Sequence, residues 1–114
     1  MSIMEDVLMA NDRVDLVFSY SADGGLGSYD AIQAAGREDE VSVIGFDASD
    51  EEQSVINEGG CYKGSIKQFP EKLAETAVEC VEKVLDGETL EEDIGVEVGV
   101  YTADGHCLCG RCYK

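Results

Sequence analysis

The sequence has no tryptophan, a single proline, a single histidine and few basic residues. Eight lysines and arginines stand against 25 aspartates and glutamates, which gives a formal net charge of −17. A surface this negative repels phosphate backbones, so we exclude nucleic acid as a partner. The only histidine, His106, lies near the C-terminus, where a Ser-His or Cys-His pair would need that end to fold over the body. We therefore expect no enzymatic activity.

Long apolar runs are also missing, and none approaches the roughly 20 residues that span a bilayer. The N-terminal segment MSIMEDVLMANDR carries acids early and has no basic start before an apolar stretch, so it does not read as a signal peptide. We expect the chain as expressed to be cytoplasmic. With 114 residues, 44% of them hydrophobic, it is long enough for one small domain with a single core.

Five cysteines are present, an odd number. Cys61 and Cys80 lie within the patterned body and are expected to pack as small apolar residues. The end of the chain reads His106-Cys107-Leu108-Cys109-Gly110-Arg111-Cys112, a spacing that can supply three or four zinc ligands. Structural zinc sites usually combine two such groups, so we expect an irregular cysteine-rich tail over 105–114, with no metal and no cofactor. Residues 1–104 form the domain.

Apolar periodicity and end signals predict alternating helices and strands. Capping-box patterns open two helices, at Ser2 and Ser49, and Pro70 suits a first helical position. Gly36, Gly59 and Gly87 are typical helix ends. The predicted helices cover residues 3–10, 25–35, 50–58 and 70–86, and the predicted strands cover 14–20, 41–46, 61–66 and 94–101.

Strands separated by helices of this length favour parallel pairing with right-handed crossovers. The expected fold class is α/β, a three-layer, doubly wound, mostly parallel sheet whose first three strands are parallel. In such sheets ligands bind beyond the carboxyl ends of the strands. Residues 21–24, 47–49 and 67–69 are therefore the positions to examine.

Two side chains at these strand ends suit a polyhydroxylated ligand. Asp47 follows a strand directly, and its carboxylate can accept two hydroxyl hydrogen bonds, although it could equally cap the next helix or a turn. Gln68 follows the next strand, and its amide both donates and accepts, although it could only stabilise a loop. The glycines from Gly24 to Gly27 could cradle an anion, but they fit no phosphate-binding motif and favour a plain helix start.

An ordered series of segments between Met4 and Thr102 resembles the C-terminal part of a known family, the ribose- and galactose-type periplasmic sugar-binding proteins of bacterial ABC importers. The segments are Val7-Leu8-Met9-Ala10-Asn11, Val14-Asp15-Leu16-Val17-Phe18, Leu26-Gly27, Ala31-Ile32-Gln33-Ala34-Ala35-Gly36, Val43-Ile44-Gly45-Phe46-Asp47, Ile66-Lys67-Gln68-Phe69-Pro70 and Ala77 through Gly87.

The resemblance implies binding of a small carbohydrate, with Asp47 and Gln68 at positions that contact sugar hydroxyls in the family. Ser21 falls where the family has an asparagine. Its hydroxyl can make one hydrogen bond to a sugar but cannot make the two-bond contact of an asparagine amide. The resemblance also implies an ABC permease as partner, and a periplasmic or cell-surface location, for a full-length parent.

Family members have two lobes that close over the sugar. The resemblance implies that this chain begins inside the second lobe and is a partial C-terminal lobe, whose helix over 70–86 would return to the missing lobe. We expect a second copy as a partner that covers the exposed face. Two alternatives stay open: the effector domain of a lactose-repressor-like regulator, and an α/β scaffold domain without a ligand.

Overall fold

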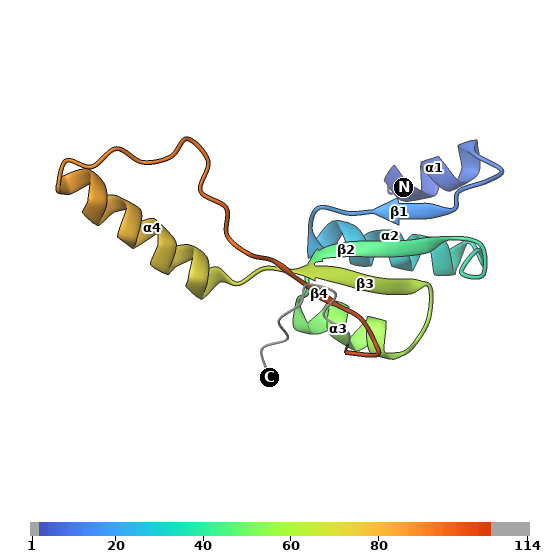
Figure 1. Cartoon of the computed structure of the whole chain (residues 1–114). Coiled ribbons are helices and arrows are strands. Elements are labelled where there is room, and N and C mark those ends of the chain that lie inside the picture. Colours follow the sequence, from blue (N-terminus) through green and yellow to red (C-terminus); the bar gives the residue numbers. More distant parts are fainter. Residues whose placement is uncertain (1–2, 106–114) are drawn as a thin grey trace.

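The structure, a computed structural model, describes residues 3–105, along which helices and strands alternate as predicted (Figure 1). Ser2 of the first capping box and the cluster from His106 to Cys112 lie outside the described residues. The helices are α1 (Ile3–Ala10), α2 (Ala22–Ala34), α3 (Asp50–Asn57) and α4 (Pro70–Leu85), and the strands are β1 (Leu16–Phe18), β2 (Ser42–Asp47), β3 (Tyr62–Lys67) and β4 (Gly99–Tyr101).

The strands form one sheet in the order β1-β2-β3-β4. β1 with β2 and β2 with β3 pair in parallel, which confirms the prediction, whereas β4 runs antiparallel to β3. The strand predicted over 94–101 is shortened to β4. Gly99 pairs with Lys67, the last residue of β3, so residues 94–98 have no β3 residue beside them to pair with. They approach α4 instead, where Ile94, Val96 and Val98 line a hollow with Leu73.

Local capping explains where the helices begin. The capping box of α3 is confirmed: Ser49 accepts from the backbone of Glu52, and Glu52 accepts from the backbone of Ser49. α2 begins at Ala22 rather than at residue 25, because Ser21 acts as its N-cap and accepts from the Gly24 amide. The glycines from Gly24 to Gly27 therefore lie inside the first turns of α2, as a plain helix start predicts.

The hydrophobic core fills one side of the sheet, between the strands and the helices α1, α2 and α3. Its centre is a T-shaped pair of rings, Tyr29 of α2 and Tyr62 of β3, with centroids 6.0 Å apart. Right-handed crossovers between neighbouring parallel strands put α2 and α3 on the same face. The buried apolar residues of this cluster are Met4, Leu8, Tyr29, Ala31, Ile32, Val41, Val43, Ile56, Cys61 and Tyr62.

The opposite face of the sheet carries no helix within residues 3–105 (Figure 1). On β1, Leu16 is 58% exposed and Phe18 is 59% exposed, while Val17 between them packs toward the core. The α/β class with a mostly parallel sheet is confirmed. The described residues supply two of the three expected layers, as a partial lobe.

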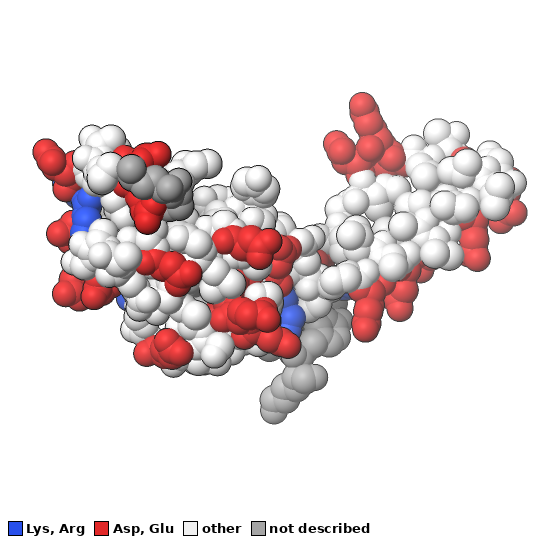
Figure 2. All heavy atoms as spheres, turned by 180° about the vertical axis from the view of Figure 1, so that it is seen from behind, with Lys and Arg blue, Asp and Glu red and all other residues white. Residues whose placement is uncertain are grey.

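α4 projects away from the sheet and gives the molecule extents of 57 × 31 × 19 Å (Figure 1). Its apolar stripe is present as predicted, but no residue of the helix is buried, and Val78, Val81 and Leu85 are all exposed. Carboxylates are scattered over the body and along this helix, with few basic side chains among them (Figure 2). Within residues 3–105, the chain forms no helix of the length and apolarity that a membrane span requires.

Candidate functional site

The structure brings Asp47 and Gln68 into direct contact at the carboxyl edge of the sheet. Asp47 ends β2 and lies beside Lys67 in the parallel register, so Gln68 follows one position beyond. The Nε2 of Gln68 donates to Oδ1 of Asp47 over 2.6 Å. Asp47 is exposed and Gln68 is half-buried, so this pair presents a carboxylate and an amide together to solvent.

The chain turns sharply at Asp47 through backbone that favours glycine. Asp47 has a φ of 102° and Ala48 a φ of 50°, a region that costs a non-glycine residue about 1–3 kcal/mol. Two hydrogen bonds hold the turn. The Ala48 amide donates to Oγ of Ser65 over 3.0 Å, and Nε2 of Gln53 donates to the Ala48 carbonyl over 2.7 Å. The Ala48 backbone is therefore held by side chains of β3 and α3, outside the turn itself.

Beneath this turn lies a buried polar cluster formed by Glu52, Tyr62 and Ser65, each fully or almost fully buried. The Tyr62 hydroxyl donates to Oε1 of Glu52 over 2.5 Å, and the Ser65 hydroxyl donates to the same oxygen over 3.0 Å. The other oxygen of Glu52 accepts from the Ser49 amide over 2.9 Å. Burial, together with the neighbouring Glu52 carboxylate, raises the pKa of the Tyr62 phenol well above its ordinary value, so it stays a donor.

Ser21 lies at the same edge, after β1. Its side chain is half-buried and accepts from the Gly24 amide over 3.3 Å as the cap of α2, while its carbonyl accepts from the Ser19 hydroxyl over 2.8 Å. The structure thus places Ser21, Asp47 and Gln68 along one edge, but only Asp47 and Gln68 are hydrogen-bonded to each other within residues 3–105. The Ser21 side-chain oxygen is already engaged as the N-cap of α2.

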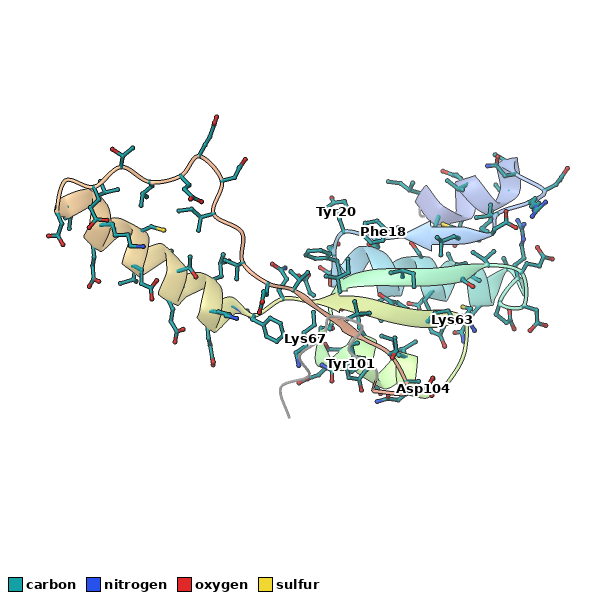
Figure 3. The ribbon with its side chains drawn as sticks, in the orientation of Figure 1. Phe18, Tyr20, Lys63, Lys67, Tyr101 and Asp104 are labelled. Atoms are coloured by element: carbon teal, nitrogen blue, oxygen red, sulfur yellow. The ribbon has the colours of Figure 1, made fainter. Side chains whose placement is uncertain are left out.

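Two aromatic residues also lie at this edge: Phe69, within the segment 67–69 that the sequence predicts to matter, and Tyr20, which the sequence analysis placed inside the strand predicted over 14–20. Tyr20, directly before Ser21, is 85% exposed and lies beyond β1 on the side of Phe18 (Figure 3). Phe69, directly after Gln68, lines the hollow beside α4. Aromatic rings pack against the apolar faces of sugars. Tyr20 was missed because the strand predicted over 14–20 ends at Phe18 in the structure, which leaves Tyr20 beyond it.

Comparison with known proteins decides the family. The sequence matches the periplasmic binding protein domain over residues 1–89. The chain belongs to the periplasmic binding protein family. Family members of this kind are solute-binding receptors rather than enzymes.

Its curated relatives in this family include import binding proteins for sugars. The ribose import binding protein RbsB of Escherichia coli (strain K12) is 32% identical over 98 residues, which are 86% of this chain and 32% of the relative. The chain thus spans about a third of the length of the curated relatives it matches.

Solved structures agree in fold. An ABC transporter solute-binding protein from Agrobacterium vitis with bound D-fucose is 28% identical, with a TM-score of 0.71 over 89% of this chain and 34% of that one. GanP, a glucose-galactose binding protein from Geobacillus stearothermophilus, has a TM-score of 0.79 over 89% of this chain and 36% of that one. At 20% identity, GanP shows the shared fold alone.

Proposed function

We propose that this chain binds one face of a small sugar, a monosaccharide or related polyol, as part of the solute receptor of an ABC importer. The observation that carries the proposal is the Asp47–Gln68 pair at the carboxyl edge of the sheet, in a chain of the periplasmic binding protein family. A carboxylate accepts two charge-assisted hydrogen bonds from neighbouring hydroxyls, and a glutamine amide both donates and accepts. Ser21 adds one hydroxyl contact.

The same proposal assigns the whole receptor a cellular location and a partner protein. We propose that it acts outside the cytoplasmic membrane, passes the sugar to an ABC permease, and leaves the sugar chemically unchanged. A receptor containing this lobe should stimulate ATP hydrolysis by its permease in proteoliposomes only when sugar is present. A permease that responds equally without sugar would contradict this assignment.

A binding experiment on the chain itself tests the sugar site. We expect D-ribose, D-glucose or D-galactose to shift the backbone amide signals near Asp47 and Gln68 in ¹H–¹⁵N spectra, with saturation only at millimolar or higher concentration. The affinity is weak because the described edge covers one face of the sugar and leaves the other in water. A one-dimensional ¹³C spectrum of the sugar in the same sample would reveal any chemical change in it.

The control ligand is tert-butanol, which has one hydroxyl and cannot bridge Asp47 and Gln68. Equal shifts with tert-butanol and with the sugars would mean a solvent effect. The absence of saturable shifts with every sugar would favour the alternative of a scaffold domain without a ligand. A repressor effector domain is not favoured, because RbsB and the Agrobacterium vitis protein described above are both binding proteins of importers.

We further propose that a second copy of the chain covers the exposed apolar surfaces. The open sheet face and the stripe of α4 both expose large apolar side chains, which commonly drive association. In sedimentation velocity, the average mass should therefore rise with protein concentration. Replacing Val78 and Val81 with aspartate should keep the protein monomeric, whereas Glu79→Ala on the acidic side of α4 should change little. A wild-type protein that stays monomeric at every concentration contradicts self-association.

A further inference from the structure

The Tyr62 hydroxyl lies where three chain segments meet under the candidate site. A Cβ on Gly45 of β2 would lie 2.0 Å from the hydroxyl oxygen, and a Cβ on Gly25 of α2 would lie 2.1 Å from it. Only glycine leaves room for the phenol at these two positions. The phenol tip therefore touches the first turns of α2, which Ser21 caps, and the strand that ends in Asp47.

The carboxylate of Glu52 connects this tip to the turn at Asp47. One oxygen of Glu52 accepts from both Tyr62 and Ser65. The Ser65 oxygen in turn accepts from the Ala48 amide, the bond that holds the left-handed turn. Ser65 also lies on β3, the strand that ends just before Gln68. The chain of hydrogen bonds thus runs from the phenol to the backbone that aims the Asp47 carboxylate.

The Glu52 carboxylate accepts from every one of its partners in this cluster. Glu52 faces three donors: two hydroxyls and the Ser49 amide. A glutamine would keep all three bonds only with its oxygen toward the Ser49 amide and with both hydroxyls reversed to accept from its NH₂. None of the three ion pairs within residues 3–105 includes Glu52, so hydrogen bonds alone satisfy its buried charge.

We infer that the buried polar cluster is a positioning device for the ligand edge, in which Glu52, Tyr62 and Ser65 hold Asp47, Gln68 and the Ser21 end of α2 in register. The inference rests on the proposed function. None of the three side chains touches the ligand. Ser65 acts through the Ala48 amide, Tyr62 acts through its contacts with Gly25 and Gly45, and Glu52 joins the two.

The test compares Ser65→Ala and Tyr62→Phe with a matched control, Tyr29→Phe. Tyr29 is also a buried tyrosine, and its hydroxyl accepts only from Gln33 of the same helix over 2.8 Å. Its loss costs a buried hydroxyl bond without touching the ligand edge. Two ligand-free signals report the turn: exchange of the Ala48 amide with deuterium, and the strong intraresidue HN–Hα NOE that a positive φ produces at Asp47.

We expect Ser65→Ala to speed Ala48 exchange about tenfold relative to the Val43 amide, the equivalent of one lost hydrogen bond. The Asp47 NOE should weaken, and the concentration of D-ribose at half-saturation should rise by a similar factor. Tyr62→Phe should act in the same direction, and it keeps the test decisive if Ser65→Ala fails to fold. Tyr29→Phe should leave all three signals unchanged while lowering thermal stability.

Two results would overturn the inference: wild-type Ala48 exchange and NOE in both cluster variants, or an equal effect in Tyr29→Phe. Either would reduce the cluster to a structural role. If wild-type protein shows no saturable shift with any sugar, the proposed function fails separately. The ligand-free signals then still decide whether the cluster holds the turn.

Discussion

Replacing Gly45 with alanine should destabilise the protein by about 3 kcal/mol. The added Cβ would lie 2.0 Å from the Tyr62 hydroxyl oxygen and 2.1 Å from Oε1 of Glu52. Neither side chain can move aside easily, because both are fully buried and bonded to each other. The substitution therefore combines overpacking with a lost hydrogen bond. In a chain of this size the melting temperature should fall by at least about 12 °C.

The matched control is Gly27→Ala in α2. A Cβ at Gly27 meets nothing within 4 Å, and the residue is helical. Alanine favours helix over glycine, so this variant should gain about 0.5–1 kcal/mol. Urea unfolding followed by circular dichroism gives both values. A Gly45→Ala variant as stable as the wild type would mean that the buried polar cluster adjusts freely, which would also weaken its assignment as a positioning device.

Helices were the most predictable part of this fold, because their end signals are local. The start of α3 is marked by Ser49 and Glu52, which are only three positions apart in sequence, and the start of α4 is marked by Pro70 alone. The short β4 was harder, since its length depends on where a distant strand, β3, ends. The exposure of apolar side chains was harder still to predict. An apolar strand such as Leu16–Phe18 has the same sequence pattern whether one or both faces of its sheet are covered.

The candidate site, too, was predictable only in part. Asp47 and Gln68 were found because each follows a predicted strand, and parallel strands end at one edge. Their mutual hydrogen bond and the buried polar cluster could not be predicted, because they depend on register. β3 carries an extra residue where Val43 pairs with Tyr62 but Ile44 pairs with Gly64. That irregularity lets Tyr62 and Ser65 point to the same side, toward Glu52, and strand alternation alone would not place them so.

Asp47→Ala should weaken sugar binding by about 2–4 kcal/mol, the contribution of two charge-assisted hydrogen bonds. This corresponds to a loss of affinity of roughly 30-fold to 1000-fold. In the chain alone, the saturable amide shifts with D-ribose should disappear. In a receptor that also contains the other lobe, calorimetry should resolve the number. Asp30→Ala removes the same charge from an exposed position on α2 and should leave the affinity unchanged. Equal affinity in the Asp47→Ala variant and the wild type would refute the ligand role of this carboxylate.

Asp47→Asn separates the ligand contact from the backbone. Alanine removes the carboxylate but also tolerates the left-handed φ of 102° less well than aspartate, so part of its effect could come from an altered turn. Asparagine keeps the shape of the side chain, accepts left-handed backbone readily, and retains an oxygen for the Gln68 amide. It loses the charge and turns the second acceptor oxygen into an NH₂ donor. If the carboxylate binds hydroxyls directly, Asp47→Asn should preserve Ala48 amide exchange and melting temperature yet lose at least about tenfold in affinity, since charged hydrogen bonds are roughly twice as strong as neutral ones. A variant that keeps both turn and affinity would show that Asp47 serves the fold rather than the ligand.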